Sequence, residues 1–190
     1  SVVIAHYNAG NYIKKALDSL ARQTMSQTDF EVIIVDDKST KPLDVILAYH
    51  GKINNLKIIR EGENYGYPSI PRNHGIDQAS GTFVMLMDQD DHLADNTLER
   101  FVSFAGDDSD VIIGKYAQGA HYNGTQVPFK TGKNIKDASM LTDHILNSLA
   151  PHKMYRPAML NTYDVRFFDS DYIPVEEDQV FNIKAYSVSR

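Results

Sequence analysis

Residues 82–92 read TFVMLMDQDDH, and this stretch decides the fold. Residues 82–87 suit a buried central strand of a sheet that is covered on both faces. Asp88, Asp90 and Asp91 follow at once, and because neighbouring carboxylates repel one another, a positive group is expected beside them. Carboxylate oxygens suit Mg²⁺ or Mn²⁺, which substrate phosphates commonly share. The stretch therefore predicts a metal-assisted site for a phosphate-bearing substrate, with a solvated helix-capping turn as the alternative.

The composition is that of an ordinary globular protein. The chain has 190 residues, of which 42% are hydrophobic and 23% charged, enough for one sizeable core. It contains no Cys, which excludes a disulfide framework and zinc–thiolate sites. Its formal net charge of −6 at pH 7 argues against nucleic acid as a partner. No signal peptide or membrane-length apolar run is visible, so we expect a cytoplasmic location.

Strands and helices are expected to alternate over the first 115 residues, which predicts an α/β fold with a mostly parallel central sheet and helices on both faces. Ligands of such sheets bind at the carboxyl ends of the strands. Besides 82–87, strands are expected at 1–5, 30–35, 56–59 and 110–114, and helices at 13–20, 42–49, 72–79 and 93–104.

The pattern changes after residue 115. Residues 116–136 suggest an irregular or hairpin segment, followed by helices at 140–149 and 176–185 and by short strands at 153–155 and 165–168. We expect one domain over 1–190, divided into two halves, 1–115 and 116–190. Because the sequence does not begin with Met, it is expected to be part of a longer protein.

Neither a dinucleotide-binding G-x-G-x-x-G turn nor a phosphate-binding P-loop is present. Five other motifs occur in order: SVVIAHYN, VDDKST, NYG with PRNHGIDQASG, MLMDQDD, and EED followed by Gln179. Their order and spacing resemble the family 2 glycosyltransferases of the GT-A fold over nearly the whole chain. The run HKMYRPAML resembles in particular the bacterial wall-teichoic-acid enzymes that add N-acetylglucosamine to polyribitol phosphate.

The resemblance places four residues around a UDP-sugar donor. Asp37 and Tyr7 belong to the uridine pocket, where a carboxylate can accept the N3–H of uracil and an aromatic ring can stack on the base. Asn64 is placed near the uracil, and Arg72 near the diphosphate or sugar, which suits its planar fork. The alternatives are a half-buried aromatic for Tyr7, a helix cap for Asp37 and a salt bridge for Arg72. The chain departs from the family at His6, because Ala5-His6 stands where Pro-Thr is usual.

The resemblance also identifies the D-x-D motif in residues 88–90. It implies that Asp90 binds Mn²⁺ or Mg²⁺ directly, that Asp88 faces the ribose or the metal, and that Asp91 reaches the donor sugar or orients the loop. Asp178 is the expected general base of an inverting transfer, and Glu177 supports it or contacts the sugar. The alternative for the last two acids is a favourable interaction with a helix N-terminus.

Two basic groups could guide an anionic polymer acceptor. The first contains Lys153 and Arg156, and the second lies within residues 130–136. Ordinary solvated surface side chains are the alternative for both.

The sequence thus predicts an inverting, metal-dependent transferase that moves a sugar, N-acetylglucosamine in the favoured interpretation, from a UDP-sugar to a polymer such as teichoic acid. Peripheral association with the inner face of the membrane and the oligomeric state are left open. The alternatives are a capsule or lipopolysaccharide transferase that uses UDP-glucose or UDP-galactose, and a non-catalytic UDP-binding module. A nucleotidyltransferase lacks support because no basic Gly-rich phosphate loop is present.

Overall fold

The computed structural model describes residues 1–118, 124–126, 135, 137–139, 152–168 and 177–189. The strands are β1 (Val2–His6), β2 (Val32–Asp36), β3 (Leu56–Arg60), β4 (Val84–Met87), β5 (Val111–Ile113), β6 (Tyr116–Gln118), β7 (Gly124–Gln126) and β8 (Lys153–Tyr155). The helices are α1 (Ile13–Ala21), α2 (Asp44–Leu47), α3 (Ser69–Asp77), α4 (Thr97–Phe104), α5 (Pro157–Thr162) and α6 (Glu177–Val188).

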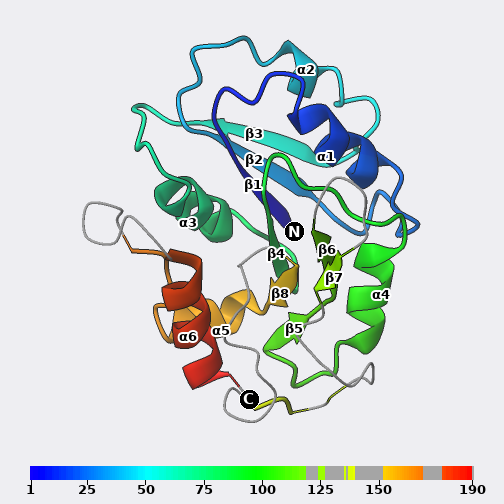
Figure 1. Cartoon of the computed structure of the whole chain (residues 1–190), viewed down its shortest axis with the longest axis vertical. Helices are drawn as coiled ribbons and strands as arrows, with labels where there is room; N and C mark the ends of the chain where they lie inside the picture. Colours follow the sequence, from blue (N-terminus) through cyan, green and yellow to red (C-terminus); the bar gives the residue numbers. More distant parts are fainter. Residues whose placement is uncertain (119–123, 127–134, 136, 140–151, 169–176, 190) are drawn as a thin grey trace.

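The main sheet has the strand order β3-β2-β1-β4-β8-β5 (Figure 1). The pairs β3–β2, β2–β1 and β1–β4 are parallel, whereas β8 runs antiparallel to both β4 and β5. The carboxyl ends of β1, β2, β3 and β4 therefore meet at one rim, which is called the carboxyl rim below. The predicted α/β fold with a mostly parallel sheet is confirmed, and β8 joins the two expected halves of the chain in one sheet.

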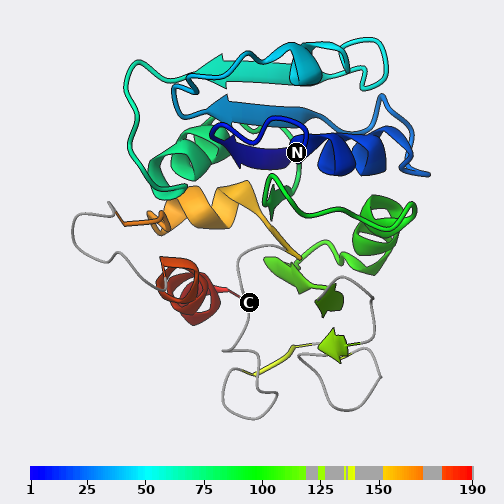
Figure 2. The ribbon, with the colours of Figure 1, turned by 45° about the horizontal axis from the view of Figure 1, so that its top comes forward.

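Apolar side chains form two cores, one on each face of the sheet. Helices α1, α2 and α4 cover one face, and α3, α5 and α6 cover the other (Figure 2). Successive strand residues alternate between the cores: Val2 and Ile4 belong to the first, and Val3 belongs to the second. A strand buried on both faces must be apolar throughout, which explains the run that ends at Met87.

Helix α3 lies unusually close to β1 because it contains a glycine at the contact. A Cβ atom on Gly75 would lie 2.2 Å from Cγ1 of Val3, a distance that no packed pair of carbon atoms tolerates. This close approach fixes α3, and with it Arg72 one turn earlier, directly against the sheet.

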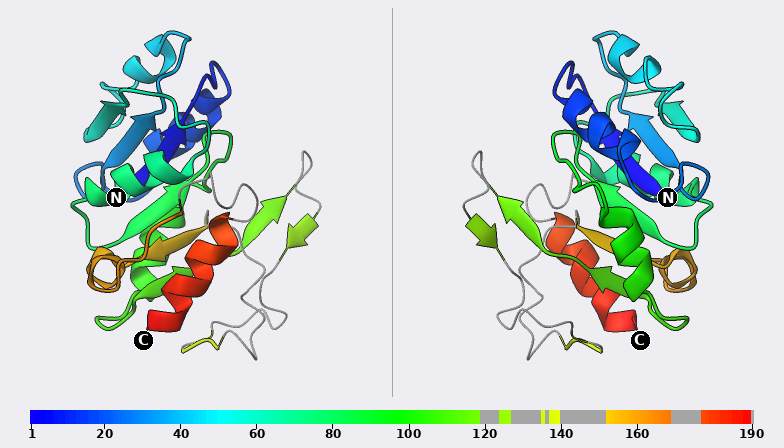
Figure 3. Two further views of the ribbon diagram at one scale, coloured as in Figure 1. Left: turned by 90° about the vertical axis from the view of Figure 1, so that its left-hand side faces the viewer. Right: turned by 90° about the vertical axis from the view of Figure 1, so that its right-hand side faces the viewer.

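Strands β6 and β7 pair antiparallel in a sheet of their own. Figure 3 shows them to one side of the main sheet. For the described residues of the segment 116–136, the pairing of 116–118 with 124–126 agrees with the hairpin alternative. The helix expected at 140–149 and the basic group within 130–136 lie outside the described residues, except for Ile135.

The helix expected at 93–104 begins later, at Thr97. The preceding segment forms hydrogen bonds with the end of α1 instead: Gln23 donates to the Ala94 carbonyl and accepts from the Leu98 N–H, while the Thr24 N–H donates to the Asp95 carbonyl. These tertiary bonds replace the first helical turn. Two other helices also shift, since α2 is shorter than 42–49 and α3 begins before Arg72, at Ser69.

The strand expected at 165–168 is wrong. The side-chain amide of Asn73 on α3 donates to the Phe167 carbonyl at 2.9 Å and accepts from its N–H at 2.9 Å. Because a side chain satisfies this backbone, no neighbouring strand is needed. Helix α6 is confirmed and extends to Val188, but Ile183, expected on its apolar face, is 47% exposed.

Glu31 lies at the rim opposite to the carboxyl rim, in the wall of a cavity of about 490 Å³. Burial alone would raise the pKa of its carboxyl, but hydrogen bonds from Lys57, Ser1 and Ser80 outweigh burial and lower the pKa to about 2. A carboxyl with a depressed folded-state pKa stabilises the fold above its ordinary value of 4.5 and loses that contribution as the pH falls toward 2.

We therefore expect Glu31→Gln to reduce the free energy of unfolding at pH 7 by about 1.5–3 kcal/mol, the range for hydrogen bonds to a charged group. Urea titrations between pH 7 and pH 3 should show a difference from the unmodified protein that narrows toward low pH. Asp29→Asn, a change at an exposed neighbour, is the control and should have little effect. A constant difference at every pH would contradict this assignment.

Candidate active site

Asp37 organises the loop that follows β3. Its carboxylate accepts hydrogen bonds from Nδ2 of Asn64 at 2.8 Å and from the N–H groups of Tyr65 at 2.9 Å and Gly66 at 3.2 Å. Among the residues that the structure describes, Tyr65 alone donates to Oδ1, and a carboxylate oxygen can accept two hydrogen bonds. The structure thus brings Asp37 and Asn64 together, and Asp37 keeps the capacity to accept an N–H from a ligand.

Tyr7 follows β1 at the same rim and is 43% exposed. The side-chain amide of Gln89 joins its backbone to the D-x-D loop, accepting from the Tyr7 N–H at 3.0 Å and donating to its carbonyl at 3.5 Å. Gln89 is a residue that the sequence reasoning passed over as the middle of D-Q-D. Its position suggests this role, because an amide side chain just after β4 can reach the backbone that follows the neighbouring strand β1.

His6 and Asp36 lie side by side at the ends of β1 and β2, and His6 immediately precedes Tyr7 in the chain. Asp36 is fully buried and accepts from the Ser39 N–H at 3.3 Å, so it caps the turn after β2. Nε2 of His6 lies 4.0 Å from Oδ1 of Asp36. Burial lowers the pKa of His6, although the charge of Asp36 opposes this shift. A neutral imidazole therefore occupies the position at which the family pattern usually has Thr.

Arg72 is the centre of the site. Its guanidinium donates to Oδ1 of Asp178 at 2.7 Å and to Oδ1 of Asp88 at 2.6 Å, and it lies 3.5 Å from Oε1 of Glu177. The side chain is only 4% exposed and packs over the Phe167 ring at 5.2 Å. Burial would lower the pKa of Arg72, but Asp178 and Asp88 outweigh burial and raise it. One permanent cation therefore joins Asp88 to Asp178, which lies 106 positions after Arg72 in the chain.

The salt-bridge alternative for Arg72 thus describes this structure, and Asp88 and Asp178 share one site as expected. Sequence reasoning missed that an arginine joins them. The resemblance places Arg72 near the donor diphosphate. A buried cation among several acids can also be the partner that these acids share.

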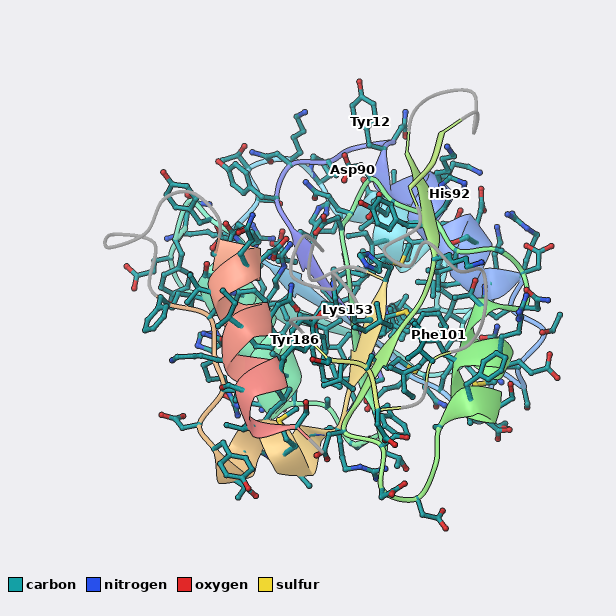
Figure 4. The ribbon with its side chains drawn as sticks, turned by 60° about the horizontal axis from the view of Figure 1, so that its bottom comes forward. Tyr12, Asp90, His92, Phe101, Lys153 and Tyr186 are labelled. Carbon is teal, nitrogen blue, oxygen red and sulfur yellow. The ribbon has the colours of Figure 1, made fainter. Side chains whose placement is uncertain are left out.

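Asp90 and Asp91 are exposed on the loop after β4, where Figure 4 shows Asp90 and His92. Partial desolvation, together with the charges of Asp88 and Asp90, raises the pKa of the Asp91 carboxyl to about 6. Among the described residues, no three His, Asp or Glu side chains are placed to hold a metal ion by themselves. Crowded hard oxygen ligands nevertheless fit a divalent cation whose remaining ligands come from a substrate or water.

Lys153 and Arg156 do not form the expected surface pair. Lys153 is completely buried in β8. Arg156 lies beyond the other end of β8, at the rim opposite to Asp88, where it donates to the Ser109 and Asp107 carbonyls. Its guanidinium also stacks over Phe83 at 4.7 Å. Arg156 is thus separated from the carboxyl rim by the length of the strand.

A carboxylate cluster around a buried arginine, at the carboxyl rim of a mostly parallel sheet with this strand order, defines a domain of the GT-A fold. The chain belongs to glycosyl transferase family 2, whose family model matches residues 1–170.

Individual relatives show which members of family 2 this chain is similar to. The poly(ribitol-phosphate) beta-N-acetylglucosaminyltransferase TarS of Staphylococcus aureus is 38% identical over 189 residues, which cover 98% of this chain and 32% of that protein. The poly(ribitol-phosphate) beta-glucosyltransferase of Bacillus spizizenii is 35% identical over 189 residues, covering 98% of this chain and 29% of that protein. A crystal structure of S. aureus TarS 1–349 in complex with UDP-GlcNAc matches with a TM-score of 0.88 and 35% identity, over 97% of this chain and 52% of that chain.

The chain therefore spans less than two thirds of the length of each of these relatives. The predicted resemblance to family 2 and to the polyribitol phosphate transferases is confirmed by these matches.

Proposed function

We propose that the protein is an inverting glycosyltransferase that moves a sugar from a UDP-sugar to a hydroxyl group of a cell-surface polymer or its precursor. The observation that carries this proposal is the bridge from Asp88 through Arg72 to Asp178. It places the acid of the D-x-D motif and the candidate base on two ends of one guanidinium, as expected if the donor anomeric carbon lies between them.

The pocket residues have separate tasks in this proposal. Tyr7 stacks on the uracil, while Asp37 accepts its N3–H and Asn64 keeps the pocket loop in place. Asp88 and Asp91 face the ribose and the donor sugar, and Glu177 contacts the sugar or supports its neighbour. Arg72 supplies positive charge next to the diphosphate and keeps the acids around it in register.

Asp178 acts as the general base. It removes the proton of the acceptor hydroxyl while that oxygen attacks the anomeric carbon and the bond to UDP breaks on the opposite face. UDP-sugars such as UDP-GlcNAc carry an α linkage, and both named relatives are called beta-transferases. Inversion in one displacement explains that change of configuration and requires a single base.

Asp90, with Asp88, would hold Mn²⁺ or Mg²⁺. When bound, the ion would offset the negative charge of the diphosphate leaving group. The acids of the loop would otherwise repel the anionic donor, so a bound cation would also offset their charge.

We therefore expect Asp90→Ala to weaken UDP binding in the presence of Mn²⁺ by about tenfold or more, which equals about 1.4 kcal/mol. Calorimetry with and without EDTA measures both affinity and metal dependence. Asp95→Ala, which removes an exposed acid paired with Arg22, is the matched control and should bind normally. Unchanged affinity of Asp90→Ala in Mn²⁺ would count against a metal at this position.

The two relatives differ in the sugar that their names give, so N-acetylglucosamine is the first candidate and glucose the second. The proposed acceptor is polyribitol phosphate. The deciding experiment supplies the purified protein with Mn²⁺, polyribitol phosphate and, in turn, UDP-GlcNAc, UDP-glucose and UDP-galactose, and measures UDP release and labelled polymer.

Transfer of one of these sugars supports the proposal and names the donor. UDP release without labelled polymer would indicate another acceptor, such as a capsule or lipopolysaccharide precursor. UDP binding without turnover of any donor would overturn the proposal in favour of a non-catalytic module. In the part of the chain that the structure describes, no helix has the length and apolarity of a membrane span. We propose that the enzyme works in the cytoplasm, where UDP-sugars are made.

A further inference from the structure

Helix α6, which carries Asp178, is attached to β8 by a buried hydrogen bond. The Tyr155 hydroxyl donates to Oδ1 of Asn182 at 2.6 Å. The Tyr155 ring also meets Phe181 edge-on, with ring centroids 5.2 Å apart. This contact fixes the helix relative to the strand one turn below its N-terminus.

The face of β8 that carries Tyr155 and the face of α6 that carries Asn182 also lie against each other nearer the carboxyl rim. Lys153 lies two residues before Tyr155, so both side chains leave the same face of the strand, about 6.6 Å apart. Asp178 lies four residues before Asn182, on the same face of the helix and about 6 Å along its axis. Both elements run away from the carboxyl rim, because β8 is antiparallel to β4 and α6 begins beside Arg72. Lys153 therefore comes level with Asp178.

The surroundings of Lys153 agree with this placement. Figure 4 shows Lys153 on β8 and Tyr186 on the neighbouring α6. The Lys153 side chain has no exposed surface, and its Nζ lies 3.4 Å from Nε2 of His152, whose ring stacks on Tyr116 at 4.5 Å. Burial, together with the charge of Lys153, lowers the pKa of His152 to about 3. The neutral ring can thus accept from the ammonium and hold it.

Burial lowers the pKa of Lys153 to about 7, and the charge of Asp178 acts in the opposite direction. An ammonium of this kind is costly to bury, and an apolar side chain of similar volume would suit the position better. A buried lysine whose charge interacts with that of a candidate base therefore calls for a functional explanation.

We propose that Lys153 is a positioning residue for Asp178, whose carboxylate it attracts and orients toward the acceptor hydroxyl while His152 holds the ammonium in place. This inference rests on the proposed role of Asp178 as general base. It replaces the acceptor-binding role that the sequence suggested for Lys153, because a side chain without exposed surface cannot receive a polymer.

The test compares Lys153→Met with Tyr155→Phe, which removes the neighbouring Tyr155–Asn182 hydrogen bond but no charge. Lys153→Met is expected to keep or raise the Tm, to lower kcat for transfer about tenfold, within the range of measured couplings between contacting residues, and to leave the donor KM within about twofold. Tyr155→Phe is expected to lower the Tm and to change kcat much less. The opposite pattern, a Tm loss with normal kcat in Lys153→Met, would show a purely structural lysine.

The rate–pH profile provides a second readout. The described ionisable groups around Asp178 are Arg72 on α3, Asp88 after β4, His152, Lys153 and Tyr155 at β8, and Glu177 and Tyr186 on α6. A carboxylate that loses a neighbouring cation holds its proton more tightly. The acid limb of the kcat profile should therefore move to higher pH in Lys153→Met, and an unmoved limb would overturn the inference.

A double-mutant cycle separates this inference from the proposed function. If Lys153 acts through Asp178, adding Lys153→Met to Asp178→Asn should cost little further activity. Additive losses would overturn the inference and leave the transferase proposal intact. An unmodified protein that turns over no UDP-sugar would instead overturn the proposed function itself.

Discussion

Asp178→Asn is expected to lower kcat for sugar transfer by about 10²- to 10⁴-fold, the usual contribution of a general base, while UDP binding stays within about twofold of normal. Asparagine has nearly the same shape, and its Oδ1 can still accept the hydrogen bond from Arg72. The change therefore removes the proton acceptor without disturbing the bridge to Asp88. Transfer kinetics and UDP calorimetry on the same preparation measure the two effects separately.

A matched control for this substitution lies at the opposite rim. Asp110 forms an ion pair with Arg156 at 3.9 Å, so Asp110→Asn also removes one partly buried carboxylate charge, but far from the donor. It should leave kcat unchanged. Near-normal turnover by Asp178→Asn would remove the general-base assignment, and a loss of UDP binding would show that Asp178 belongs to the donor pocket instead.

Arg72→Met is expected to abolish transfer and to reduce the free energy of unfolding by up to about 3 kcal/mol. Removing one partner of a buried ion pair costs about 3–5 kcal/mol, but water partly screens these acids because their side chains are between 13% and 38% exposed. For a chain of this size the loss corresponds to a fall in Tm of up to about 10 °C.

Two further variants test this explanation. Arg72→Lys keeps the charge but cannot donate to two carboxylates in a fork, so it should recover part of the stability and little of the activity. Arg156→Met removes the arginine at the opposite rim and should lower the Tm without loss of UDP binding. A stable and active Arg72→Met protein would contradict the central position of Arg72.

Several features of the fold could be predicted because they depend on local pattern. The apolar run before Asp88 predicts a strand buried on both faces. Asp37 follows the second strand of the same parallel sheet, so the sequence also predicts that Asp37 lies at the same rim as Asp88. The proximity of Asp88 and Asp178 was also predictable, but only from the resemblance to the family 2 glycosyltransferases. By themselves, three acids at a helix start do not distinguish a base from a favourable helix terminus.

Other features depend on contacts between residues that are far apart in the sequence, and a local sequence pattern does not predict such contacts. A three-residue strand such as β8 gives too little periodicity to predict that it runs antiparallel between β4 and β5. Lys153 looked like one of several surface cations because its burial arises only when α6 packs on that strand. Residues 165–168 are apolar enough for a strand, but the amide of Asn73 on a helix satisfies their backbone.

The position of β8 also has a consequence during synthesis. Until Lys153–Tyr155 leave the ribosome, β4 has β1 on one side and no β8 on the other, so the strand leading to the D-x-D motif has an unpaired edge. Such edges invite pairing with other chains. The nascent polypeptide must therefore protect this apolar strand while some 65 more residues are translated, and a chaperone that covers that edge should raise the yield of native protein.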